Sequence, residues 1–172
     1  TLIYIYIIKY IYIYIYMIKN RIKILKKINK GSLNNKFCEV AKNSYTKQVG
    51  EFDIQYFDKG YWAKLYQVKL KDEYVITLKV QTLSEKKDVR YTSFEQWALG
   101  KCSDLVIKGH TPSLTLYYKE QQCSFDNKNF ILLFSEYIDS GNLQNWLIKN
   151  VSNDDIWKVF FFQIIHTIYC LK

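Results

Sequence analysis

Proline and glycine are scarce in this sequence of 172 residues, which has one proline and six glycines. Together with a hydrophobic share of 49%, this argues for a packed globular body and against a disordered chain. No C-x-x-C pair is present, so neither a zinc site nor a dense disulfide framework is indicated. We therefore expect free thiols, in a reducing, cytosol-like compartment, at Cys38, Cys102, Cys123 and Cys170.

Acidic residues are almost missing from the first 50 positions, where ten Lys or Arg stand against one acid. Residues 51–172 hold fifteen of each sign, so the net charge of +9 belongs to the N-terminal arm. The neutral body gives no signal for specific nucleic-acid binding. We expect residues 17–50 to be a loosely structured basic leader with a short helix or strand. It would be either solvated or bound electrostatically to nucleic acid or anionic lipid.

The sequence begins with alternating tyrosine and isoleucine, in TLIYIYIIKYIYIYIYMIKN. Membrane contact by residues 1–18 is not favoured, because the apolar run is barely long enough to span a bilayer. The alternation is also typical of an aggregation-prone strand. Repeated TA dinucleotides, read in triplets, encode the same pattern. We expect residues 1–16 to be translated AT-rich upstream DNA and the natural start to be Met17.

Three strand-like runs follow from residue 51, and they are EFDIQYF, YWAKLYQVKL and EYVITLKV. Connections as short as those between them require antiparallel hairpins, so residues 51–80 are predicted to form a three-stranded meander. In the second strand Tyr66, Val68 and Leu70 share one face. The sheet is therefore predicted to have one covered face.

A helix is predicted over residues 92–102. Phe94, Trp97 and Ala98 stand at i, i+3 and i+4, the spacing that places side chains on one buried face of a helix. Thr92 or Ser93 could cap its start.

SLTLYYKE and NFILLFSEYI are predicted as two more strands. GNLQNWLIKN and SNDDIWKVFFFQIIHTIYCLK are predicted as helices, the second capped by Ser152 and apolar nearly all round. The predicted fold class is α+β, with a five-stranded antiparallel sheet, one helix after its third strand, and two further helices.

This order of elements resembles the small lobe of a protein kinase followed by the first helices of its large lobe. VITLKV is similar to the third-strand motif V-A-I-K, with Lys79 as its lysine, and Glu95 stands in the following predicted helix. DKGYWAKLYQV resembles the glycine-rich hairpin, with Gly60 as its central glycine and Leu65 at the position that packs on adenine. The resemblance implies that Lys79, held by Glu95, binds the α and β phosphates of ATP.

LLFSEYIDSGNL resembles the hinge that meets the adenine ring of ATP. The resemblance places Ser135 at the gatekeeper position and the backbone from Glu136 to Ile138 at the adenine edge. Asn142 would lie near the ribose.

The sequence departs from the kinase pattern in two respects. In G-x-G-x-x-G the outer positions are Asp58 and Ala63, and the charge of Asp58 predicts weakened nucleotide affinity. No H-R-D or D-F-G segment is present, and His166 lies inside a predicted helix. We therefore assign no catalytic residue and no metal ligand to this chain, and expect the ligands of Mg²⁺ beyond residue 172.

The resemblance covers about residues 51–172. It implies an N-terminal fragment of a serine/threonine protein kinase that binds ATP, with the small lobe and hinge at 51–138 and a truncated large lobe at 139–172. The alternative is a catalytically inactive, kinase-like binding module tethered by its basic or hydrophobic arm. A narrower resemblance, in LVIKGHTPSLTLYYKEQQC and FFFQIIHTIYCLK, is to kinases of giant DNA viruses. It implies a location in the host cytoplasm, and the protein substrate stays unknown.

Overall fold

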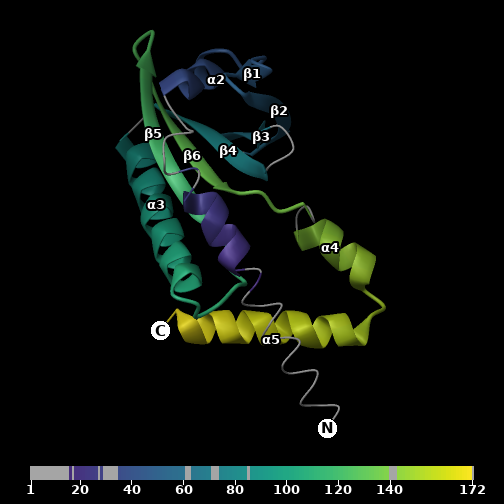
Figure 1. Cartoon of the computed structure of the whole chain (residues 1–172). Helices are drawn as coiled ribbons and strands as arrows, with labels where there is room; N and C mark the ends of the chain where they lie inside the picture. Colours follow the sequence, from purple (N-terminus) through teal and green to yellow (C-terminus); the bar gives the residue numbers. More distant parts are fainter. Residues whose placement is uncertain are drawn as a thin grey trace.

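The computed structural model contains a six-stranded antiparallel sheet accompanied by helices, the mixture that an α+β class predicts (Figure 1). The sheet order is β1-β2-β3-β4-β6-β5. The strands are β1 (Gln48–Val49), β2 (Phe52–Lys59), β3 (Ala63–Leu70), β4 (Tyr74–Leu83), β5 (Tyr117–Phe125) and β6 (Lys128–Glu136). The structure describes residues 16, 18–26, 28, 35–60, 63–70, 74–84, 86–139 and 143–171. The predictions for residues 1–15, Met17 and Asn142 lie outside these ranges.

Strands β2, β3 and β4 form the predicted meander. Val68 on β3 lies opposite Ile54 on β2 and Ile76 on β4. Because successive side chains of a strand alternate between faces, Tyr66 and Val68 share the covered face, where both are buried. The prediction for this face is confirmed.

The sheet has a sixth strand that the sequence did not predict. β1 pairs with β2 at the edge of the sheet, where Val49 lies opposite Phe52. Two residues are too few to show an alternating pattern, so a strand of this length cannot be recognised from periodicity.

The β5–β6 hairpin turns at Asp126 and Asn127, whose φ angles are 49° and 57°. Positive φ at both central residues is the geometry of a type I′ turn, whose twist matches that of paired strands. Asp and Asn tolerate this conformation better than most residues. Because the turn lies at Asp126 and Asn127, strand β5 extends to Phe125. The strand begins at Tyr117, four residues after the start of the predicted run SLTLYYKE.

Helix α3 (Lys86–Ile107) begins well before the predicted start. The backbone N and the hydroxyl of Ser84 donate to Asp88 Oδ2 at 2.9 and 2.8 Å. These bonds hold the beginning of the helix here, so the predicted cap at Thr92 or Ser93 is wrong. Thr92 lies within the helix and donates its hydroxyl to the backbone oxygen of Asp88 at 2.8 Å.

The predicted buried side of α3 is also wrong. Phe94 and Trp97 are 66% and 59% exposed, whereas Val106 is buried. The spacing i, i+3, i+4 shows that residues share a helix face. It does not decide which face meets the sheet.

The main core lies between the sheet and the N-terminal arm. The arm contributes a helical segment at residues 18–26, a 3-10 turn η2 (Asn35–Phe37) and helix α2 (Cys38–Lys42). Ile28, Phe37 and Val40 are buried in the same cluster as the inner faces of the strands. The Phe37 ring meets Phe52 and Phe134 edge-on, with centroids 5.3 and 5.2 Å apart.

The described part of the arm is therefore a folded cover on the sheet, which contradicts the expectation of a loosely structured, solvated leader. Hydrophobic residues of the arm are spaced irregularly between lysines, so their burial is set by the sheet surface that they meet and not by a local period. The core draws on residues on both sides of position 50.

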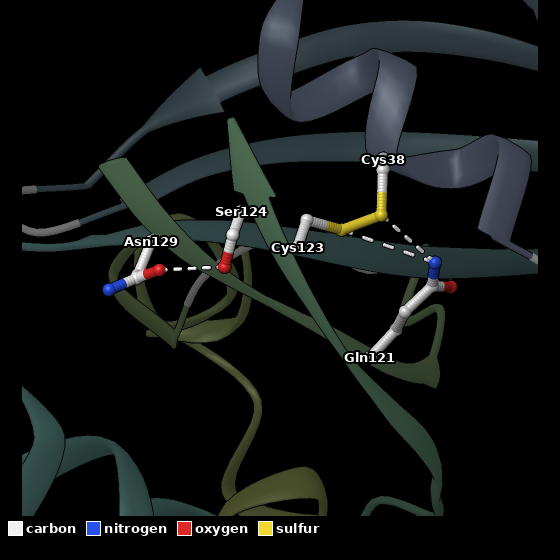
Figure 2. The surroundings of a disulfide bond; sticks show 5 residues. All are labelled: Cys38, Gln121, Cys123, Ser124 and Asn129. Carbon is white, nitrogen blue, oxygen red and sulfur yellow. Dashed lines mark hydrogen bonds between the residues drawn. A yellow bond between two sulfur atoms is a disulfide. The ribbon is translucent and has the colours of Figure 1, made fainter. Parts of the chain in front are cut away.

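A disulfide joins Cys38 on α2 to Cys123 on β5 (Figure 2). Gln121 donates from Nε2 to Cys38 Sγ at 3.1 Å. The expectation of four free thiols is wrong for this pair, while Cys102 and Cys170 are free. The bonded cysteines are 85 residues apart in the sequence, and only the packing of the arm on the sheet brings them together.

Helices α4 (Leu143–Asn150) and α5 (Asp154–Cys170) follow the sheet, and α5 lies apart from the strands in Figure 1. Asn153 accepts from Ile156 N at 3.1 Å and caps α5, so the predicted cap at Ser152 is wrong. The described side chains of α5 include no buried residue. The apolar surface predicted for this helix is thus exposed, as Ile165 at 66% illustrates.

No helix in the described ranges has both the length and the apolar character needed to cross a membrane.

Candidate functional site

Lys79 and Glu95 form an ion pair between strand β4 and helix α3. Lys79 Nζ donates to both carboxylate oxygens of Glu95, at 2.6 and 2.8 Å. The side chains are 28% and 34% exposed, so solvent and a ligand can reach the pair. The structure therefore brings these two predicted residues together. An ammonium group held on a rigid strand by one carboxylate still has capacity to bind an anionic ligand.

Two leucines flank Lys79 on the neighbouring strands. Its cross-strand partners are Leu65 on β3 and Leu133 on β6, and residues directly opposite in an antiparallel sheet project on the same face. Since Leu78 and Val80 point into the main core, this row lies on the opposite face. Leu65 was predicted from the sequence, whereas Leu133 is identified only by the register of β6 with β4.

The row of Lys79, Leu65 and Leu133 combines a cation with apolar side chains. Leu133 is 2% exposed, so Lys79 and Leu65 are the members of this row that can meet a ligand with an anionic end and a flat apolar ring.

Gly60 lies at the end of β2, beside the hairpin connection to β3. A Cβ atom added to Gly60 would meet only the Ala63 backbone oxygen, at 3.6 Å, and its φ is outside the positive range. The described backbone therefore does not require glycine at this position. Any requirement for glycine would come from a ligand that approaches the hairpin.

Replacing Gly60 by alanine is expected to leave the free energy of unfolding unchanged or to raise it by about 0.4–1 kcal/mol, because alanine restricts the unfolded chain without strain. Gly50→Ala is the matched control. Gly50 has a φ of +59°, so alanine there should cost about 1 kcal/mol. Urea unfolding measures both. Equal losses in the two variants would contradict the hairpin geometry.

Asp58 lies on β2 opposite Leu65, next to an irregularity of the strand between Tyr56 and Asp58. Its Oδ1 accepts from Lys59 N at 2.7 Å. This bond occupies one carboxylate oxygen with the backbone of the hairpin. The side chain is exposed, and its register opposite Leu65 places it on the same face as the row of Lys79.

The predicted hinge includes the last residues of β6 and the start of the connection to α4. Ser135 lies opposite Thr77 on β4, and Thr77 Oγ1 donates to the Glu136 backbone oxygen at 3.4 Å. Ile138 lies beyond the strand and is 51% exposed. The Glu136 carboxylate accepts from Arg21 Nε at 2.7 Å, a contact that the sequence analysis missed because the two residues are 115 positions apart.

Two tyrosines of β5 lie near the charged groups of this region. Burial raises the pKa of Tyr117, and the carboxylates of Glu120 and Glu95 raise it further. Burial also raises the pKa of Tyr118, with a smaller contribution from Glu136. In both residues the environment therefore disfavours the ionised phenol.

The described residues include no group of three or more His, Cys, Asp or Glu placed to hold a metal ion. His166 lies within α5, as predicted, and its ring stacks on Phe162 with centroids 6.1 Å apart. No model of a known protein family matches the chain, and no curated protein matches it.

Proposed function

We propose that this chain is the ATP-binding, N-terminal part of a serine/threonine protein kinase of the kind encoded by giant DNA viruses. The observation that carries the proposal is the ion pair of Lys79 with Glu95. It joins a lysine on the third strand of the meander to a glutamate on the next helix, the pairing that positions nucleotide phosphates in protein kinases.

In the proposed complex each residue of the site meets a different part of ATP. Lys79 binds the α and β phosphates, and Leu65 packs on the adenine ring. The hairpin at Gly60 covers the phosphates, and the backbone from Glu136 to Ile138 meets the adenine edge. Asn142, which lies outside the described residues, is proposed to contact the ribose. Mg²⁺ would accompany ATP and neutralise its phosphates, with no ligand assigned here.

The sequence contains no H-R-D or D-F-G segment, so we assign to this chain the binding of ATP and not the transfer of its phosphate. The alternative is a catalytically inactive, kinase-like binding module tethered by its N-terminal arm. The exposed carboxylate of Asp58 favours this alternative over an efficient enzyme, because it opposes phosphate binding. Both candidates share the nucleotide site, and the location proposed for both is cytoplasmic.

Lys79→Ala is expected to weaken the binding of Mg²⁺-ATP by about tenfold or more, because it removes a charge-assisted hydrogen bond to phosphate. The measurement is a titration of the full chain with a fluorescent ATP analogue. Lys64→Ala is the matched control, since Lys64 lies on the neighbouring strand and its Nζ donates to Ser44 Oγ at 2.5 Å. Equal affinities of the wild type and Lys79→Ala would exclude the proposed site.

A further inference from the structure

Arg21, from the helical segment at residues 18–26, joins three separate parts of the chain. Its Nε and Nη2 donate to the two carboxylate oxygens of Glu136 at 2.7 and 2.5 Å. Its Nη1 donates to the Pro112 backbone oxygen at 2.6 Å, and Nη2 also donates to the backbone oxygen of Leu114. One guanidinium group thus ties the arm to the end of β6 and to the connection between α3 and β5.

Glu136 completes this network with its own backbone. Its Oε2 accepts from Leu116 N at 3.2 Å, and its backbone N donates to the Leu116 oxygen at 2.8 Å. The side chains of Arg21 and Glu136 are only 13% and 17% exposed. A two-pronged bond between guanidinium and carboxylate fixes direction as well as distance, and low exposure protects it from screening by salt.

The consequence is that the backbone at the end of β6 is held from outside the sheet. Beyond Glu136 the chain leaves the strand and enters the connection to α4. A segment that leaves a sheet loses the ladder of hydrogen bonds that would fix it, so the Glu136 side chain and the contact of the Tyr137 ring with Phe57 help to hold it. The arm supplies the partner of the Glu136 carboxylate.

We propose that Arg21 is a positioning residue for the nucleotide site and that it fixes the backbone of residues 136–138 through the Glu136 carboxylate. This inference rests on the proposed function, since it assigns the adenine side of that site to these residues. Arg21 does not touch the ligand in this arrangement. The N-terminal arm is then a structural part of the binding site, and loss of the Arg21 contact weakens binding although all ligand contacts remain.

The test uses the full chain with Arg21→Ala and Arg21→Lys, and Lys23→Ala as the matched control from the exposed side of the same segment. Affinity is measured for Mg²⁺-ATP and, separately, for adenosine, which has no phosphate. Arg21→Ala is expected to weaken both by the same factor, about tenfold. Lys79→Ala should weaken ATP alone. Arg21→Lys keeps the positive charge but loses the paired hydrogen bonds of the guanidinium group. Its affinities should therefore lie between those of the wild type and Arg21→Ala.

Hydrogen exchange without nucleotide gives a second readout that does not depend on binding. Faster exchange of the peptides covering residues 112–118 and 134–139 is expected in Arg21→Ala and not in Lys23→Ala. Unchanged exchange there, or unchanged adenosine affinity, would overturn the positioning role alone. A wild type that binds neither ATP nor adenosine would overturn the proposed function, and the positioning role with it. Far-ultraviolet circular dichroism verifies that each variant is folded.

Discussion

Replacing Phe37 by alanine will lower the free energy of unfolding by about 3–5 kcal/mol, the range for a buried phenylalanine in a core. Phe37 is 1% exposed, and its ring packs between those of Phe52 and Phe134. Alanine would leave a cavity between the arm and the sheet and would remove both edge-on ring contacts. This loss is a large part of the stability of a domain of this size.

The matched control is Tyr45→Ala, a change of similar size in the same arm. Tyr45 is 88% exposed, so the expected change is within about 0.5 kcal/mol. Urea unfolding followed by tryptophan fluorescence compares the two variants. A solvated arm would give the same small change in both, and that result would contradict the core described above.

Breaking the disulfide is the second change with a large expected effect. Cys38→Ser should lower the free energy of unfolding by about 2–4 kcal/mol without reductant, because the bond restricts the unfolded chain over a long loop. The sequence separation of 85 residues makes this loop long. Either substitution opens the same loop, so the effect depends little on which partner is changed. Cys123→Ser should behave alike.

Reductant separates the disulfide from other effects of the substitution. With excess dithiothreitol the wild type should fall to the stability of Cys38→Ser, while Cys102→Ser, which changes a free cysteine, should respond as the wild type does. If the free energy of unfolding of the wild type were the same with and without reductant, that result would contradict the disulfide. Because reducing compartments keep most cysteines as thiols, a protein held in the cytoplasm would have the lower of the two stabilities.

The arm and the proposed nucleotide site lie on different faces of the sheet. Tyr66, Val68 and Leu78 point toward the arm and are buried, whereas Lys79 points toward α3. Side-chain alternation along β3 and β4 produces this division. The covered face supplies the stability that holds the strands in register, and the other face is left for Lys79 and its leucine neighbours.

Much of the sheet could be predicted from the sequence because its information is local. Alternation in YWAKLYQVKL and EYVITLKV, with short polar breaks between the runs, gave the meander and its buried face. The pairing of Lys79 with Glu95 was implied by the resemblance to protein kinases and not by any local pattern of the sequence. Strand β1 could not be predicted, since two residues carry no period, and the start of α3 depended on a capping contact of Ser84 with Asp88.

What the sequence by itself determined is the meander of β2, β3 and β4, its buried face, and the presence of the later strands and helices, because local alternation and helical spacing carry that information. The tertiary structure alone decided three features, namely the arm that covers the sheet, the bond of Cys38 with Cys123, and the contact of Arg21 with Glu136. Each joins segments separated by many residues. Such contacts depend on which surfaces the folded strands expose to each other, and no local pattern carries that information.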